Sequence, residues 1–262
     1  MNVIIFSYNR YSQLELLLTS LNKHSRDNLN ISILYQERED ILPVKKTQDK
    51  IVKKFSKLKN ISSIKTESSI DFKKDVIRLL DSGSEHILFC SDSNIIYRPI
   101  DFGLAEKSLQ ENKNVVCFSL RLGRNITHCY NTHTDNNLYG VEDDGEELIK
   151  WFWNKAYLDF GYPFSFDGHI FRTKEIKQLI KNARGKTPVE LEDGLQIFDT
   201  FPKGEMMAFK ESVLVSRADV LEGAGEMREL TIRYAGGARL VYTNSYFKDV
   251  DAVIKEINLK FK

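Results

Sequence analysis

The stretch Asn2-Val3-Ile4-Ile5-Phe6-Ser7, followed by Leu14, Leu17, Leu18 and Leu21, decides the fold class of this chain. The first run is apolar and has the length of a strand, which is typical of strands buried on both faces of a parallel sheet. The four leucines are spaced i, i+3, i+4 and i+7, so they form the apolar stripe of a helix, which Ser12 and Glu15 begin as a capping box. A buried strand followed at once by an amphipathic helix predicts an α/β fold.

The same alternation continues as far as residue 120. We predict further strands at 31–35, 86–91 and 115–120, and further helices at 45–59, 71–82 and 101–111, with room for one more strand before the third helix. Asp71 is the expected N-cap of that third helix, and Gly83 is its expected left-handed stop. This order of elements predicts a doubly wound, mostly parallel sheet flanked by helices.

Length and charge narrow the class of protein. With 262 residues, 42% of them hydrophobic, the chain can bury roughly 70–75% of its unfolded surface, which suits one large domain. The 38 Lys and Arg residues nearly balance the 37 Asp and Glu residues, so no bulk field attracts a polyanion and nucleic acid is not an expected partner. Because no linker or repeat divides the chain, we predict a single domain over residues 1–262.

The ends and the cysteines point to the cytoplasm. The first residues lack the basic region and cleavage site of a signal peptide, and no stretch approaches the ~18 apolar residues of a membrane span. Cys90, Cys117 and Cys129 each lie in an apolar segment, which predicts core residues in a reducing compartment. The lysine-rich helix at 45–59 is either a solvated face or a peripheral contact with the inner face of a membrane.

Beyond residue 120 the pattern becomes aromatic-rich. The segment from Trp151 to Phe166 holds Trp153 among several phenylalanines and tyrosines, and such rings either bind sugars or pack a core. Helices are predicted at 173–183 and 188–199, and a C-terminal helix at 249–258.

Polar residues follow the first two predicted strands. In open parallel sheets ligands gather at the carboxyl ends of the strands. Ser7, Tyr8, Asn9 and Arg10 combine hydrogen-bonding groups with a cation ahead of a helix, which suits a nucleotide base and its phosphates. A capped turn is the alternative. Gln36, after the second strand, can bond a base edge or a ribose.

The strand at 86–91 leads into Ser91-Asp92-Ser93-Asn94. Asp92 and Asn94 offer the hard oxygen ligands that Mg²⁺ or Mn²⁺ takes when a diphosphate and water supply the rest. A plain turn stabilised by these side chains is the alternative.

Asp167-Gly168-His169 forms a second candidate turn. Gly168 permits a close backbone approach to a ligand, and Asp167 and His169 offer hydrogen-bonding or metal-ligating groups. A buried structural histidine is the alternative. We therefore expect substrate contacts at these three residues and at Trp153.

Two acids lie near the start of the helix predicted at 188–199. Thr187 is its expected N-cap and Glu190 the capping-box partner. Glu192 and Asp193 follow, and either can accept a proton from an incoming hydroxyl or simply complement the helix dipole.

These motifs together resemble nucleotide-sugar glycosyltransferases of the GT-A fold, in particular the glycosyltransferase-2-like group. The stretch Val3-Ile-Ile-Phe-Ser-Tyr-Asn-Arg10 looks like their first strand, and Asp92-Ser93-Asn94 occupies the place of their Asp-x-Asp metal motif. Asp167-Gly-His-Ile-Phe-Arg172 is similar to their acceptor-side segment. Glu192-Asp193 matches their Glu-Asp pair, whose Asp is the base in inverting members.

The resemblance implies a nucleotide-diphosphate sugar donor, with UDP favoured, a divalent metal (Mn²⁺ or Mg²⁺) and a glycan or lipid-linked acceptor, in bacterial surface glycan synthesis. Residues 1–120 become the nucleotide-binding half and residues 121–262 the acceptor half with its C-terminal helix. Asp193, with Glu192, becomes the catalytic pair. Since Ser93 and Asn94 replace possible acidic ligands, only Asp92 carries over to the metal.

Two other functions remain open. A sugar nucleotidyltransferase uses a similar sheet but needs a glycine-rich loop after the first strand, and the loop from Ser7 to Ser12 contains no glycine. A binding or assembly module that has lost catalysis agrees with the incomplete acidic motif at Asp92.

Overall fold

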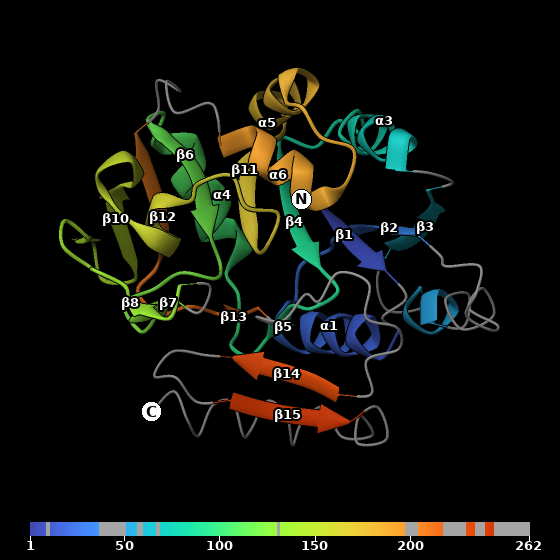
Figure 1. Ribbon diagram of the computed structural model, residues 1–262, viewed down its shortest axis with the longest axis horizontal. Coiled ribbons are helices and arrows are strands. Elements are labelled where there is room, and N and C mark those ends of the chain that lie inside the picture. Colours follow the sequence, from blue (N-terminus) through green and yellow to red (C-terminus); the bar gives the residue numbers. More distant parts are fainter. Residues whose placement is uncertain are drawn as a thin grey trace.

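The computed structural model describes residues 1–8, 11–36, 51–56, 60–66, 69–129, 132–196, 204–216, 229–233 and 239–243. Their centre is a nine-stranded sheet in the order β3-β2-β1-β4-β11-β6-β12-β10-β9 (Figure 1). Its strands are β1 (Asn2–Tyr8), β2 (Asn30–Gln36), β3 (Asn60–Lys65), β4 (His86–Ser91), β6 (Val115–Ser119), β9 (Glu142–Asp144), β10 (Leu148–Phe152), β11 (His169–Arg172) and β12 (Glu205–Phe209).

Three two-stranded ladders accompany this sheet. They are β5 (Ile95–Ile96) with β13 (Leu214–Val215), β7 (His128–Cys129) with β8 (Thr134–Asp135), and β14 (Glu229–Arg233) with β15 (Arg239–Thr243). The helices are α1 (Tyr11–His24), α3 (Ser69–Leu79), α4 (Phe102–Glu111), α5 (Thr173–Asn182) and α6 (Pro188–Gln196), with 3₁₀ turns η1 (Trp153–Lys155) and η2 (Leu158–Gly161). Residues 51–55 are also helical.

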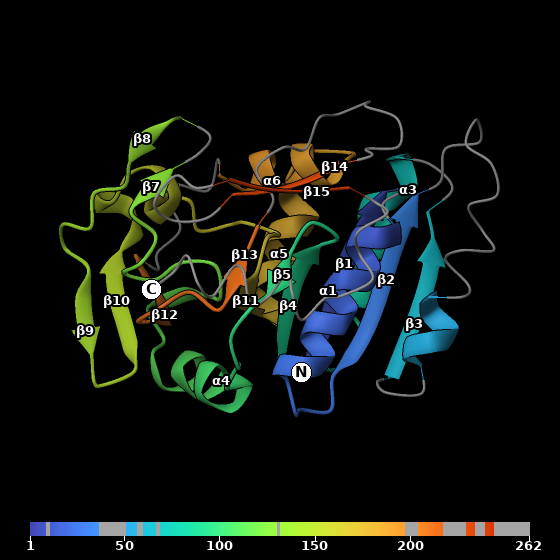
Figure 2. The same ribbon diagram turned by 90° about the horizontal axis from the view of Figure 1, so that it is seen from below.

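The sheet is mostly parallel, as predicted. Strands β3, β2, β1 and β4 pair in parallel, and β12 pairs in parallel with β6. Within the described sheet only β11 and β10 run against the other strands. Figure 2 shows the full width of the sheet, from β3 at one edge to β9 at the other.

Alternation along β1 builds a core on each face. Val3 and Ile5 pack with the apolar stripe of α1 and with α4, whereas Ile4 and Phe6 pack on the opposite face with α3, α5 and α6. Successive residues of a strand point to opposite faces, so a continuous apolar run buries both. Figure 1 accordingly shows α3, α5 and α6 on one side of the sheet and α1 on the other.

Several predicted element boundaries need correction. Helix α1 begins at Tyr11, so Ser12 lies inside its first turn and is not the N-cap. Helix α3 begins at Ser69, so the predicted cap at Asp71 is wrong in the same way. Gly83 has the predicted left-handed conformation, with a φ of 83°, but α3 already ends at Leu79, four residues earlier, so Gly83 is not the residue that stops the helix. Helix ends predicted from Ser and Asp alone are uncertain by one or two residues, because these side chains also occur within the first turn.

Other predictions are met in part. The additional strand expected before the third helix is present as β3. Within the predicted helix at 45–59, residues 51–55 are helical, and residues 45–50 and 57–59 lie outside the described residues. Helix α6 is described to Gln196. The C-terminal helix predicted at 249–258 also lies outside the described residues.

The three cysteines are core residues, as predicted. Cys90, Cys117 and Cys129 are buried thiols without a disulfide partner among the described residues. Burial raises the pKa of the Cys90 and Cys117 thiols well above its ordinary value, so both remain protonated. Across the described residues we find no helix with the length and apolar character needed to cross a membrane.

The direction of β11 brings distant turns together. Because β11 runs antiparallel between β4 and β6, its amino end lies at the edge where those two strands have their carboxyl ends. The Gly168 N–H donates to the Phe89 carbonyl (2.9 Å), and the Leu120 N–H donates to the Gly168 carbonyl (2.8 Å). The turn before β11 therefore meets the turns after β4 and β6.

Candidate active site

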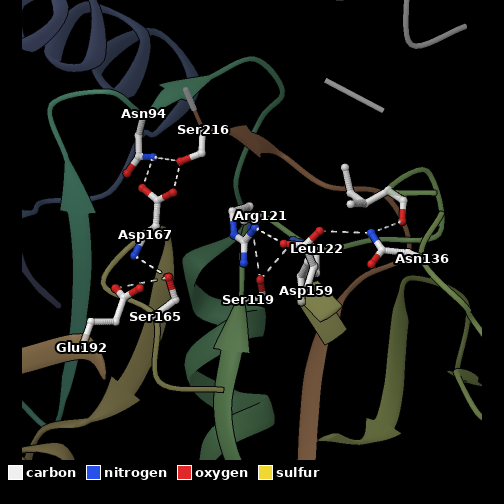
Figure 3. Close-up of polar contacts among 11 residues, drawn as sticks. Asn94, Ser119, Arg121, Leu122, Asn136, Asp159, Ser165, Asp167, Glu192 and Ser216 are labelled. Atoms are coloured by element: carbon white, nitrogen blue, oxygen red, sulfur yellow. Dashed lines mark hydrogen bonds and ion pairs between the residues drawn. The ribbon is translucent and has the colours of Figure 1, made fainter. Parts of the chain in front are cut away.

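Asp167 is the centre of a hydrogen-bond cluster at this edge. Its Oδ1 accepts bonds from the Ser91 hydroxyl (2.9 Å) and the Asn94 Nδ2 (2.5 Å), and its Oδ2 accepts a bond from the Ser216 hydroxyl. Figure 3 shows Asn94 and Ser216 converging on this carboxylate. Two of the predicted turns, Ser91–Asn94 and Asp167–His169, are thus joined by direct contacts.

The turn after β4 is ordered by its own side chains. The Asn94 Oδ1 accepts a bond from the Ser91 N–H (2.9 Å), and the Ser91 and Ser93 hydroxyls lie 2.6 Å apart. Asp92 is 3% exposed, and its N–H donates to the Phe6 carbonyl (2.9 Å). This bond places Asp92 directly beside the carboxyl end of β1.

Glu192 reaches the same cluster from α6. Its Oε2 accepts a bond from the Phe166 N–H (2.5 Å) and a longer one from the Ser165 hydroxyl (3.5 Å). Burial raises the pKa of Glu192 to about 7, although the Phe166 N–H lowers it; Asp167 adds to the rise. A carboxyl group with a pKa near neutrality is characteristic of functional sites.

Asp193 projects differently from its neighbour. Adjacent helical residues lie about 100° apart around the axis, and Asp193 is exposed whereas Glu192 is partly buried. The Tyr162 hydroxyl donates to the Asp193 Oδ1 (3.4 Å). Burial, together with the negative charge of both acids, raises the pKa of Tyr162 well above its ordinary value, so it remains a donor.

The position of α6 depends on tight backbone packing. A Cβ atom at Gly194 would lie 2.1 Å from the Arg184 carbonyl oxygen, so only glycine permits this approach. The Thr187 hydroxyl accepts a bond from the Glu190 N–H (3.2 Å), as predicted for an N-cap. The Glu190 carboxylate bonds the Lys186 N–H (2.8 Å), one residue earlier than the capping box predicts.

A buried cation completes the cluster. Arg121 follows β6 and donates from NH1 to the Asp159 Oδ1 (2.8 Å), and Asn136 donates to the Asp159 Oδ2 (3.1 Å). Burial raises the pKa of Asp159, but Arg121 and Asn136 hold it below its ordinary value. Burial alone would lower the pKa of Arg121. The carboxylates of Asp159, Asp167 and Glu192 outweigh this effect and raise the pKa above its ordinary value, so the guanidinium stays charged. Figure 3 shows Arg121 between the Asp167 group and the Asp159 group.

The donor set fits a divalent cation only when a diphosphate and water supply most of its ligands. Among the described residues no three His, Cys, Asp or Glu side chains come together as a metal cluster. Asn94 turns its amide nitrogen toward Asp167 and its oxygen toward the Ser91 N–H. Asp92 is therefore the one carboxylate of this motif that suits a metal held mainly by phosphate oxygens.

The nucleotide-side residues are described in part. Ser7 is buried near the end of β1, and its hydroxyl has no hydrogen-bond partner within the described residues. Tyr8 and Gln36 are the last residues of β1 and β2, whose parallel pairing sets them side by side. Asn9 and Arg10 lie outside the described residues.

Two of the expected substrate-binding side chains are in the core. Trp153 is 8% exposed and packs edge-on against Phe164 (6.3 Å between ring centroids), so its ring face is not open at the surface. His169 is fully buried; its Nδ1 donates to the Pro163 carbonyl (3.1 Å), and burial lowers its pKa to about 3, so it is neutral. Gly168 adopts a φ of 80°, which favours glycine at this turn.

Arg172 belongs to the segment Asp167–Arg172 that resembles the acceptor-side motif. It lies at the carboxyl end of β11, at the opposite end of the strands from the Asp167 cluster. Its guanidinium donates to the carbonyls of Val115 (2.6 Å) and Asn112 (2.7 Å), and to that of Leu109. It therefore ties β11 to the end of α4 and has a structural role.

Sequence reasoning missed five polar residues of the cluster, namely Arg121, Asp159, Tyr162, Ser165 and Ser216. The position of Arg121, directly after the strand predicted at 115–120, was a usable signal, because residues after strands meet at this end of the sheet. Asp159, Tyr162 and Ser165 lie in the aromatic-rich segment from Trp151 to Phe166, whose pattern does not single them out, and Ser216 lies in a segment without a recognisable pattern.

Relatives of known class were found by sequence and by structure, although no family model matches the chain. The bifunctional glycosyltransferase pgtA of Dictyostelium discoideum is 24% identical over 196 residues, which cover 68% of this chain and 24% of pgtA. TarS of S. aureus, residues 1–349, superposes with a TM-score of 0.55 at 14% identity, over 82% of this chain and 59% of that one. TarS in complex with UDP-GlcNAc gives 0.50 at 15% identity, over 82% of this chain and 57% of that one.

This chain therefore spans about a quarter of the length of pgtA and less than two thirds of TarS 1–349. Its mixed nine-stranded sheet and the helices on both faces agree with the structural neighbours. The chain has the GT-A fold of nucleotide-sugar glycosyltransferases.

Proposed function

We propose that this chain is a glycosyltransferase that moves a sugar from a nucleotide-diphosphate sugar to an acceptor hydroxyl. One observation carries the proposal. Asp167 accepts hydrogen bonds from Ser91 and Asn94, in the turn that holds Asp92 beside the end of β1, and Glu192 of α6 accepts a bond from the N–H of Phe166, the residue before Asp167. Ligands of open α/β sheets bind at this edge, where the strands have their carboxyl ends.

The donor occupies the side of the edge formed by β1 and β2. Ser7, Tyr8, Asn9, Arg10 and Gln36 bind the nucleotide. The Ser7 hydroxyl supports this assignment, since it has no hydrogen-bond partner in the part of the chain that the structure describes and a buried donor without a partner is costly. UDP is the favoured nucleotide, since TarS, which shares the fold, has been crystallised with UDP and with UDP-GlcNAc.

Asp92 would supply one ligand of Mn²⁺ or Mg²⁺, with the donor diphosphate and water supplying the others. The metal, when bound, stabilises the negative charge that develops on the leaving diphosphate. The acceptor side is formed by Asp167, Gly168 and α6. The exposed Asp193 is the general base, and the Tyr162 hydroxyl orients its carboxylate.

In the transfer the acceptor hydroxyl gives its proton to the Asp193 carboxylate while its oxygen forms a bond to the anomeric carbon of the donor sugar. The bond from that carbon to the diphosphate oxygen breaks, and the nucleoside diphosphate leaves. This direct displacement inverts the configuration of the anomeric carbon. The acceptor class is a glycan or lipid-linked hydroxyl, in bacterial surface glycan synthesis on the cytoplasmic side of a membrane.

A calorimetric screen tests the donor assignment. The chain is titrated with UDP, GDP, CMP and dTDP, each with and without Mn²⁺. We expect UDP to bind most tightly and to bind better with Mn²⁺. Absence of binding by all four nucleotides contradicts the proposal.

A non-catalytic binding module is the second candidate, favoured by Asn94, which directs its amide nitrogen at Asp167 where the related motif has an acid. Turnover separates the two candidates. Tight nucleotide binding, combined with release of nucleoside diphosphate no faster than the enzyme-free control for every donor and acceptor tried, supports the module.

A further inference from the structure

Two side chains on one face of α6, Glu192 and Gln196, hydrogen-bond the backbone of the segment that precedes Asp167; this pair of contacts is called the grip below. Glu192 and Gln196 are four residues apart, so they lie on the same face of the helix. The Gln196 Nε2 donates to the Phe164 carbonyl (3.0 Å), and the Glu192 Oε2 accepts from the Phe166 N–H (2.5 Å). The two side chains thus bond alternate backbone groups of an extended segment.

This grip reaches Asp167 through a short relay. The Ser165 hydroxyl lies 3.5 Å from the Glu192 Oε2 and accepts a bond from the Asp167 N–H (3.2 Å). The Asp167 carboxylate then receives Ser91 and Asn94 from the turn after β4. Glu192 is therefore connected to both sides of the proposed site.

We propose that Glu192 is a positioning residue, which as a carboxylate fixes the turn at 165–167 and so holds Asp167 and the turn at 91–94 in register with α6. This inference rests on the proposed function and assigns Glu192 a role different from that of Asp193. The observation that separates the two acids is that Glu192 bonds the Phe166 N–H, whereas Asp193 is exposed.

The charge on Glu192 decides whether the grip holds. Two donors, the Phe166 N–H and the Ser165 hydroxyl, point to its Oε2, and both favour the carboxylate over the acid. Among the described residues, the titratable groups that face Glu192 from neighbouring elements are Asp167, Arg121 and Tyr162. Asp167 favours protonation of Glu192, whereas Arg121 and Tyr162 favour its charge. With a pKa of about 7, the carboxylate form grows from about a tenth to about nine tenths between pH 6 and pH 8.

Nuclear magnetic resonance tests the grip without any activity. The full chain is labelled with ¹⁵N-phenylalanine, and the Phe166 signal is identified as the one lost in Phe166→Leu. We expect the Phe166 amide proton to shift with an apparent midpoint near pH 7, and Glu192→Gln to abolish the shift. A Phe166 amide that does not titrate, or that titrates unchanged in Glu192→Gln, overturns the proposal.

The pH profile of kcat tests its consequence. We expect the kcat of the parent to rise about ninefold from pH 6 to pH 8. The kcat of Glu192→Gln, which is neutral at every pH as protonated Glu192 is, should change less than twofold over this range and should stay near the pH 6 value of the parent, about ninefold below the parent at pH 8. Gln196→Ala is the matched control, because it removes the other half of the grip and keeps the titrating acid. It should lower the melting temperature but keep the ninefold rise.

The outcomes separate this inference from the function on which it rests. A loss of 10²-fold or more in kcat for Glu192→Gln at every pH makes Glu192 a catalytic base and overturns the positioning role. A Glu192→Gln variant that keeps the ninefold rise also overturns it. A parent chain without turnover contradicts the proposed function, and the Phe166 titration then still decides whether the grip exists.

Discussion

At the scale of single residues, Glu192 and Asp193 show how position along a helix separates two acids. Asp193 is exposed with a tyrosine hydroxyl 3.4 Å away, whereas Glu192 turns inward to a backbone N–H and shares its surroundings with Asp167. Two acids adjacent in the sequence therefore have different surroundings: the Asp193 carboxyl group is exposed to water, and the Glu192 carboxyl group is partly desolvated.

The raised pKa of Glu192 predicts a pH-dependent contribution to stability. Its pKa rises from 4.5 in the unfolded chain to about 7 in the fold, so the folded state holds the proton more tightly. This contribution is complete below pH 4.5 and is lost as the pH rises through 7, for a total on the order of 3 kcal/mol. Urea unfolding at several pH values from 4.5 to 8 should show this decline in the difference between the parent and Glu192→Gln. Parallel curves for the two proteins would contradict it.

Asp92 carries the prediction for the metal. Asp92→Asn keeps the shape of the side chain but removes the charge that balances a cation, so the affinity for UDP should fall by about 1–3 kcal/mol and should no longer depend on Mn²⁺. Calorimetry with and without Mn²⁺ measures both effects. Asp193→Asn, on the acceptor side, should keep the metal dependence of the parent. If Asp92→Asn binds with the same metal dependence as the parent, Asp92 is a turn residue only.

At the scale of elements, the placement of α6 is set by one glycine. In an isolated helix Gly→Ala stabilises by about 1 kcal/mol, but at Gly194 the new Cβ would lie 2.1 Å from the Arg184 carbonyl. Backbone cannot yield as a side chain can, so we expect Gly194→Ala to lower the free energy of unfolding by about 1–3 kcal/mol and to reduce kcat more than nucleotide affinity.

Gly103 of α4 provides the matched control. A Cβ atom there meets only the Asp101 side chain, at 3.3 Å, so Gly103→Ala should leave the free energy of unfolding unchanged or slightly higher. Urea unfolding of both variants measures the contrast. Equal effects of the two substitutions would show that α6 does not depend on this close approach.

At the scale of the whole molecule, the sequence predicted the half of the fold that is built from local periodicity. The strands β1, β2, β4 and β6 and the stripe of α1 follow from apolar spacing, because that spacing reports which faces are buried. The insertion of β11 between β4 and β6 could not be read in the same way. It depends on pairing between segments about 80 residues apart along the chain, such as His169 with Phe89.

The residues of the candidate site likewise fall into those marked by a local sequence pattern and those that depend on contacts between distant segments. Asp92 was predicted because it follows a strand with a recognisable pattern, Asp167 because it belongs to an Asp-Gly-His turn, and Glu192 and Asp193 because they lie near the start of a helix with a recognisable N-cap. The ion pair of Arg121 with Asp159 was not predicted, because a contact between residues 38 apart leaves no mark on either segment alone, although the place of Arg121 after a strand was a usable signal. Trp153 was expected at the surface of the site and is core, since an aromatic-rich segment serves both purposes equally well.

The release of nucleoside diphosphate from a sugar nucleotide tests the proposed transferase most directly. The chain is incubated with the donor whose nucleotide binds best in calorimetry, with Mn²⁺ and with glycan acceptors, and Asp193→Asn is measured in parallel. We predict release well above the enzyme-free control, and a kcat about 10²–10⁴-fold lower for Asp193→Asn with donor affinity unchanged. Release by the parent no faster than the control, despite tight nucleotide binding, would contradict the account.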